Sequence, residues 1–202
     1  MQRLPRYYRC LRNMIGEDIL RVSSEELAAQ MGLSAAVVRQ DFRCLGGMGQ
    51  QGYGYNVKDL YTRVGELLGV ATNYQMILVC SSDYDAAFAG HPLFLCRGTR
   101  LRAVFDLRAQ SESTCGELPL YPIERLEAYC SENHPRIAAL AVSYRDAPSI
   151  AARLEACGID AIWNLSGARL QTSHAIVRDL NMLDSLLELT CLLHSAEDPS
   201  SD

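Results

Sequence analysis

Hydrophobic residues repeat with two different periods along the chain, and the change falls near residue 74. Before it, apolar side chains recur every three or four positions, which predicts amphipathic helices. We expect four helices here. The first ends near residue 16, the second lies between residues 23 and 32, and the other two cover residues 35–45 and 57–68. After it, short apolar runs alternate with amphipathic segments, which is typical of a parallel sheet with helices on both faces. The strands are expected at about 75–80, 100–106, 137–143 and 159–164, and the helices near 84–90, 122–132, 146–157 and 181–194.

The stretch SSEELAAQMGLSAAVVRQDF has the features of two short helices joined by a tight turn. Ser23 and Glu26 have the spacing of a capping box, and Gly32 is suited to end the first helix. The pattern predicts a helix-turn-helix, whose second helix enters the DNA major groove and presents its outward side chains to the bases. The candidate DNA-contacting residues are Ser34, Ala35, Ala36, Arg39, Gln40 and Arg43. A helical hairpin with a merely solvated outer face is the alternative.

Glycines surround polar and aromatic residues in the stretch GGMGQQGYGYNV, residues 46–57. Such a pattern predicts a β-hairpin, a wing that lies against the phosphate backbone or in the minor groove. Gln50, Gln51 and Tyr53 are its candidate DNA contacts. A loose hinge between two helices is the alternative.

These elements indicate a DNA-binding domain over residues 1–73, a sensor or dimerisation domain over 74–194, and a disordered tail over 195–202. Charge is divided in the same way. Residues 1–73 hold nine basic and seven acidic side chains, a net charge of +2, whereas the remainder has a net charge of −7. The two parts are therefore expected to have different partners. The last helix is apolar over so wide a face that we expect it to be buried against a second subunit.

Composition argues against a membrane span, a signal peptide and a metal site. The chain has 49% hydrophobic and 21% charged residues, as ordinary globular proteins do. No apolar run approaches the ~18 residues of a membrane span, and the Arg-rich start lacks the apolar stretch of a signal peptide, so a cytoplasmic protein is expected. The eight cysteines include no CxxC pair, which predicts no metal site. Most are expected to be small buried residues in a reducing compartment.

Several stretches together resemble the Rex family of redox-sensing transcriptional repressors over nearly the whole chain. In order, they are RLPRYYRCL, RVSSEELAAQMGLSAAVVRQDFRCLGGMGQQGYGYNV, HPLF, AVFD, GELPLY, ACGIDAIWNL and VRDLNM. The resemblance implies an α/β homodimer that joins a winged helix-turn-helix to a Rossmann-like parallel sheet and exchanges its C-terminal helices between subunits. It also implies binding to a palindromic operator in double-stranded DNA when NADH is low, and release when NADH binds.

The resemblance carries over unevenly to individual residues. The helix-turn-helix frame with Arg39 and Asp41 is kept, as are the wing glycines Gly52 and Gly54. Basic residues of the family are replaced by neutral Gln40, Gln50 and Gln51. Two positions belong to the family's conformational switch: the first-helix arginine, kept as Arg9, and an aspartate that can pair with it, replaced by Asn181.

The family's NAD(H)-contacting positions differ most. They fall on Cys80, Ser81, Ser82, Asp83, Tyr84, Asp85, His91 and Asp106. Asp106 retains the acid that binds ribose hydroxyls. The three glycines of the phosphate loop, however, are Cys80, Ser82 and Asp85, and the family's tyrosine near the nicotinamide is His91.

Charge in this loop opposes a bound pyrophosphate. Asp83 and Asp85 stand where the family offers backbone amides, and each close like charge costs on the order of 1 kcal/mol at a partly solvated site. We therefore expect a DNA-binding repressor whose NADH sensing is lost or altered, and we assign it no cofactor. A working NADH sensor with a changed loop is the alternative.

The residues bear on two other functions. An NAD-dependent oxidoreductase is disfavoured, because no positioned acid, base or nucleophile accompanies the sheet and the four histidines are scattered. We expect no enzyme and no catalytic residue. An interaction protein that has lost DNA binding also remains open, because Gln50 and Gln51 weaken the expected contact with phosphates.

Overall fold

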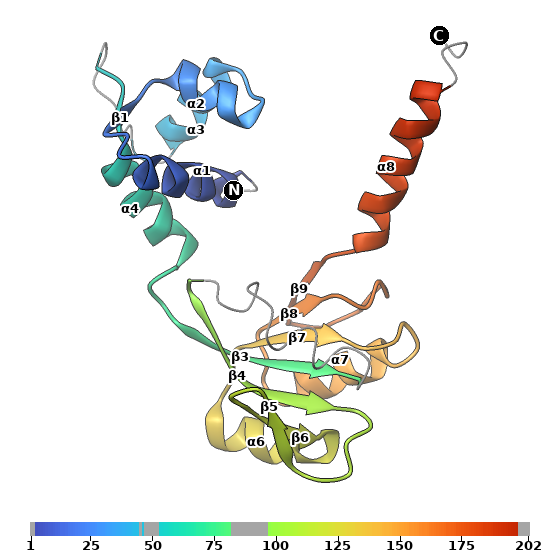
Figure 1. Ribbon diagram of the computed structural model, residues 1–202. Helices are drawn as coiled ribbons and strands as arrows, with labels where there is room; N and C mark the ends of the chain where they lie inside the picture. The colour runs from blue at the N-terminus through green and yellow to red at the C-terminus, as the bar shows by residue number, and fades with distance from the viewer. Residues whose placement is uncertain (1–2, 45, 47–52, 82–96, 198–202) are drawn as a thin grey trace. The chain divides into compact units, whose positions relative to one another are not determined.

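The computed structural model describes residues 3–44, 46, 53–81 and 97–197 of the chain (Figure 1). The chain forms two compact units, Met1–Thr72 and Asn73–Asp202. Each unit encloses apolar side chains of its own.

Four helices and a small two-stranded sheet make up the amino-terminal unit. The helices are α1 (Leu4–Gly16), α2 (Ser24–Met31), α3 (Ala35–Cys44) and α4 (Val57–Leu68), and the strands are β1 (Arg21–Val22) and β2 (Tyr55–Asn56). The four helices predicted from periodicity are confirmed, although Leu45, the expected end of α3, lies outside the described residues.

Local chemistry defines the turn between α2 and α3. Ser23 and Glu26 form the predicted capping box, with each side chain bonded to the other residue's backbone N–H. Gly32 ends α2 at a φ of 62°, in the left-handed region that glycine adopts without strain. Beneath the turn, Leu27 of α2 and Phe42 of α3 are buried in one cluster with Tyr7 of α1.

The segment after α3 returns to the helices as strand β2. Tyr55 pairs with Val22, and Asn56 pairs with Arg21, in antiparallel register. Gly54, at a φ of 68°, lies so close to this pairing that a Cβ atom would meet the carbonyl oxygen of Val22 at 2.8 Å. The predicted hairpin thus has one described strand whose partner is β1, and residues 47–52 lie outside the described range.

The carboxy-terminal unit contains a seven-stranded sheet in the order β5-β6-β4-β3-β7-β8-β9. The strands are β3 (Tyr74–Cys80), β4 (Thr99–Asp106), β5 (Ser113–Cys115), β6 (Leu118–Pro122), β7 (Ile137–Ala141), β8 (Ala161–Asn164) and β9 (Ile176–Asp179). All neighbours are parallel except β5 and β6, which form an antiparallel pair. The order reverses at β3, between β4 and β7, and ligands of such sheets bind outside the carboxyl ends of the strands at this point.

The four predicted strands are confirmed as β3, β4, β7 and β8. Strands β5, β6 and β9 were not predicted from the hydrophobic pattern. These strands are short, and most of their residues are partly or fully exposed, so they lack the continuous apolar run by which a buried strand is recognised.

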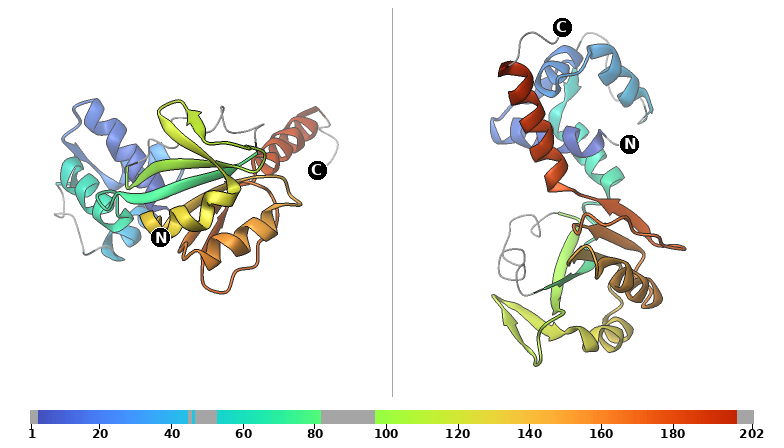
Figure 2. Two further views of the ribbon diagram at one scale, coloured as in Figure 1. Left: turned by 90° about the horizontal axis from the view of Figure 1, so that it is seen from below. Right: turned by 90° about the vertical axis from the view of Figure 1, so that its right-hand side faces the viewer.

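Helices α6 (Leu126–Asn133) and α7 (Ala147–Ala156) lie on the same face of the sheet (Figure 2). Helix α7 falls within its predicted segment, whereas α6 is preceded by a 3₁₀ turn, Ile123–Arg125, and ends one residue past the predicted end at 132. The opposite face carries a second apolar cluster that includes Leu78, Cys80 and Val104. The helix predicted near 84–90 lies outside the described residues.

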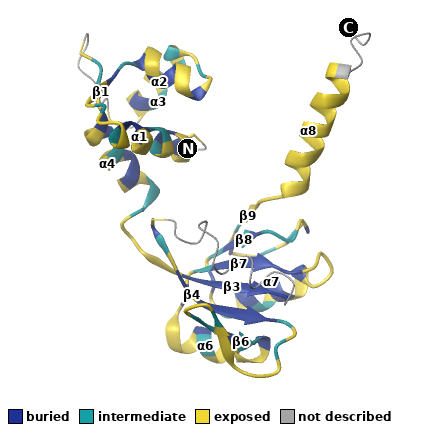
Figure 3. Cartoon of the chain, viewed as in Figure 1, coloured by how far each residue is buried: buried dark blue, intermediate teal, exposed yellow. Residues whose placement is uncertain are grey.

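Helix α8 (Met182–Glu197) differs from every other described helix in its exposure (Figure 3). Its described side chains, residues 182–196, are all exposed, including six leucines. It runs three residues past the predicted end at 194, and residues 198–202 lie outside the described range. Among the described helices, none is long and apolar enough to cross a membrane.

Candidate nucleic-acid interface and ligand site

The outer face of α3 carries the predicted DNA-contacting side chains. Ala36, Arg39, Gln40 and Arg43 are exposed, and Ala35 is half-buried. Ser34 precedes the helix, and its hydroxyl accepts a hydrogen bond from the Val37 amide at 3.4 Å.

Burial on the inner face fixes this orientation. Val38 and Phe42 are buried there, whereas Val37, also expected to face inward, is only half-buried. The buried side chains anchor the helix and leave a polar stripe facing outward.

Arg39 is held by the first turn of α2. Its Nη1 donates to the Ser24 hydroxyl at 3.0 Å and to the Glu25 carboxylate at 2.9 Å. Glu25 was not among the sequence candidates, because nothing in the sequence indicates that residues fourteen apart meet across the turn.

Asp41 acts inside the unit and does not face outward with Arg39. Its carboxylate accepts two hydrogen bonds from Arg3, at 2.6 and 2.7 Å, and one from the Tyr7 hydroxyl at 2.9 Å. Arg3 is the largest cause that holds the pKa of Asp41 below its ordinary value. The pKa of Tyr7 is raised, first by burial and then by Asp41. These contacts tie α1 to α3, so Asp41 positions the helix that carries Arg39.

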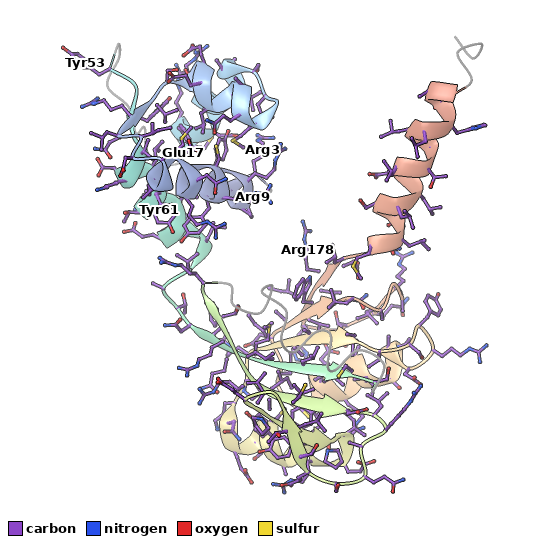
Figure 4. The ribbon with its side chains drawn as sticks, viewed as in Figure 1. Arg3, Arg9, Glu17, Tyr53, Tyr61 and Arg178 are labelled. Atoms are coloured by element: carbon purple, nitrogen blue, oxygen red, sulfur yellow. The ribbon has the colours of Figure 1, made fainter. Side chains whose placement is uncertain are left out.

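Tyr53 projects from the base of the wing (Figure 4). Arg21 of β1 donates through Nη1 to the Tyr53 carbonyl at 3.0 Å, and its guanidinium lies 5.9 Å from the centre of the Tyr53 ring. The structure therefore adds Arg21, an exposed cation, to the predicted wing surface. The other wing candidates, Gln50 and Gln51, lie outside the described residues.

The two positions that the resemblance assigns to a switch lie in different units. Arg9 is exposed on α1. Asn181 directly precedes α8, where its Oδ1 accepts from the Leu183 amide at 3.1 Å and its Nδ2 donates to Asp184 at 2.9 Å. Asparagine in this place caps the helix.

The candidate ligand site is described only where the strands end. Asp106, at the end of β4, is buried, and its Oδ1 accepts from the Arg108 amide at 2.8 Å. Cys80 and Ser81, at the end of β3, are also buried. The remaining predicted positions, Ser82, Asp83, Tyr84, Asp85 and His91, lie outside the described residues.

These ends fit part of a dinucleotide. The carboxyl group of Asp106 ends the strand next to β3, as a ribose-binding acid requires. Cys80 packs in the apolar cluster of the sheet, so its side chain is part of the core.

The described histidines do not converge on a catalytic site. His134 ends α6 and His194 lies on α8, whereas the His174 Nδ1 lies 3.3 Å from Glu155. The backbone amides of His174, Ala175 and Ser173 lower the pKa of Glu155 to about 2, which keeps this carboxylate charged and bound to its loop. Within the described ranges, no group of three metal-ligating side chains occurs.

The cysteine prediction was wrong in part. Cys80 and Cys130 are buried as expected, but Cys44 and Cys191 are exposed. No disulfide bond joins any of the seven described cysteines. Burial, together with neighbouring Cys157, raises the pKa of Cys130 to about 12.

The chain is similar to known proteins both in sequence and in structure. A family model described as "Putative DNA-binding protein N-terminus" matches residues 1–42. Two proteins named redox-sensing transcriptional repressor Rex align with 98% of this chain. One, from Caldanaerobacter subterraneus subsp. tengcongensis, is 35% identical over 89% of its own length, and the other, from Clostridium botulinum, is 33% identical over 95%.

Solved structures agree with these relatives. The crystal structure of RSP in complex with beta-NAD+ and operator DNA has a TM-score of 0.89 and 33% identity, covering 97% of this chain and 91% of that one. RSP in complex with beta-NADH has a TM-score of 0.86 and 30% identity, covering 97% and 93%. Both similarities extend over the two units.

Proposed function

The chain belongs to the Rex family of transcriptional repressors, and from this premise we propose that it binds an operator in double-stranded DNA as a homodimer. The observation that carries the proposal is the outward guanidinium of Arg39 on α3, above a buried anchor of Val38 and Phe42. A helix in this setting places its outward side chains against base edges in the major groove. The operator-bound relative supports the same use of the domain.

Arg39→Ala is expected to weaken operator binding by about 1–3 kcal/mol, because one paired hydrogen-bond contact with a guanine is lost. The measurement is fluorescence anisotropy on a duplex selected by the protein from a random library. Arg63→Ala is the matched control, since Arg63 is an exposed arginine of α4 paired with Glu66. An Arg39 variant that binds the selected duplex like the Arg63 variant would contradict the assignment.

We further propose that control by NADH is lost or altered in this member. The support lies in the sequence of the loop after β3, where Ser82 and Asp85 replace glycines and Asp83 adds a second negative charge. Repulsion between these carboxylates and a pyrophosphate opposes binding, and side chains in place of glycine hydrogens would occupy space that the phosphates need.

Titration calorimetry with NADH is therefore expected to give no saturable heat at micromolar ligand. The same protein sample is titrated with the selected duplex, which shows that it is active. In parallel, NADH is added to the protein–DNA complex and is expected to leave the anisotropy unchanged. Saturable micromolar binding accompanied by DNA release would instead establish a working sensor.

A working NADH sensor is the second candidate, and Asp106 favours it. This acid ends β4 beside β3, where a ribose would be bound. The NADH complex of a relative at 30% identity is consistent with that use. A catalytic function has less support, since the relatives are named as repressors.

A further inference from the structure

We propose that Glu25 is a positioning residue that sets the base selectivity of Arg39. Ser24, Glu25 and Arg39 form a closed triangle. Arg39 Nη1 donates to both partners, and the Ser24 hydroxyl donates to the second carboxylate oxygen of Glu25 at 3.1 Å. This inference rests on the proposed DNA binding and deepens it.

The triangle holds one side of the guanidinium and leaves the rest of its donors to DNA. Both contacts use Nη1, whereas a paired contact with guanine N7 and O6 can use Nη2 together with a neighbouring N–H. An arginine side chain loses rotamer entropy when it is ordered, and a protein partner that pre-orients it removes part of this cost at the moment of binding.

Ser24 gives the triangle a rigid base. It is buried in the first turn of α2, and the capping box of Ser23 and Glu26 fixes that turn. Glu25 itself is exposed, with 67% of its side chain accessible. The pKa of Glu25 lies below its ordinary value, because a backbone amide, the Ser24 hydroxyl and Arg39 all stabilise the charged form.

An exposed carboxylate on a DNA-facing surface has an unfavourable interaction with phosphates. Its presence beside Arg39 therefore lowers affinity for DNA of any sequence. In return, Glu25 increases selectivity. An oriented guanidinium favours contact with guanine, whereas a freely rotating one binds phosphate oxygens as readily as a base. Loss of Glu25 should therefore lower selectivity without lowering the affinity for DNA of any sequence.

The test measures discrimination at single base pairs of the duplex selected by the wild-type protein. The base pair read by Arg39 is first identified as the pair whose replacement no longer matters in Arg39→Ala. At this pair, Glu25→Ala is expected to reduce discrimination roughly tenfold, since a guanidinium that is no longer oriented loses most of its preference for guanine. Affinity for non-selected DNA should be unchanged or higher.

Two variants separate positioning from charge and from folding. Glu26→Gln removes the same charge from the next residue and preserves the capping box, so discrimination should stay at the wild-type value. Glu25→Gln keeps an acceptor for Arg39 and should retain more discrimination than Glu25→Ala. Ratios measured on one sample do not depend on its active fraction.

Unchanged discrimination in Glu25→Ala, or an equal loss at every base pair, would overturn the positioning role while leaving DNA binding intact. A wild-type protein that selects no sequence from the library would instead overturn the proposed function, and this inference with it.

Discussion

Replacing Leu186 and Leu189 of α8 together by glutamate is expected to convert the dimer into a monomer and to weaken operator binding by at least about 100-fold. Both leucines are more than half exposed in the single chain. Burying a leucine side chain stabilises an interface by about 1.5–3 kcal/mol, and a buried unpaired carboxylate adds a further cost. Operator binding falls because each monomer can occupy only one half-site of a palindrome.

The spacing along α8 identifies which face is expected in the interface. Met182, Leu186, Leu189 and Leu193 follow one another at intervals of four, three and four residues. This is the seam along which one helix packs against another. The other leucines of α8 are also exposed in the single chain and widen the apolar face.

The control for this pair lies on the opposite side of the same helix. Cys191→Glu with Ser195→Glu adds the same charge at exposed positions away from the seam. Sedimentation equilibrium should show a dimer for the control and a monomer for the leucine variant. A leucine variant that remains dimeric would exclude α8 as the main dimerisation element.

Asn164→Asp is expected to destabilise the carboxy-terminal unit by about 2–4 kcal/mol at neutral pH, through loss of buried hydrogen bonds and a new buried charge. Asn164 is 1% exposed. Its Nδ2 donates to the Ala168 carbonyl and to Asp179, each at 2.7 Å. Its Oδ1 accepts from the Ser166 hydroxyl at 2.6 Å and from the Ser166 amide at 3.1 Å.

The aspartate would turn two attractive contacts into repulsive ones. An oxygen in place of Nδ2 faces the Ala168 carbonyl and the Asp179 carboxylate, and neither can donate. Burial and Asp179 both raise the pKa of the new carboxyl in the folded state. The folded variant therefore binds a proton more tightly than the unfolded chain, and its deficit should shrink as pH falls through that raised pKa toward the ordinary value of about 3.9.

Urea unfolding followed by the fluorescence of Trp163 reports on this unit, because Trp163 is the only tryptophan and precedes Asn164. Asn133→Asp is the control. It makes the same substitution at an exposed asparagine that donates one hydrogen bond, to the Tyr129 carbonyl, and should cost less than about 1 kcal/mol. Equal losses in the two variants would show that the Asn164 network contributes little.

Much of the architecture follows from short-range patterns. Helical periodicity and the capping box of Ser23 and Glu26 located α1 to α4, and apolar runs located the four central strands. The exposed strands β5, β6 and β9 could not be predicted in this way, because they are stabilised by pairing with neighbouring strands and have no apolar run of their own. Residue identities also placed Arg39 on an outward face, because its neighbours Val38 and Phe42 are apolar.

By itself, then, the sequence determined the order of elements, the helix-turn-helix with its outward polar stripe, and the family to which the chain belongs. Only the tertiary structure decided which side chains act together. It joined Asp41 to Arg3 across 38 residues, Arg39 to Glu25 across 14, and Tyr53 to Arg21 across 32. The physical reason is that capping and periodicity act within a few residues of the chain, whereas a hydrogen bond between distant residues exists only after packed cores have brought two elements to within about 3 Å.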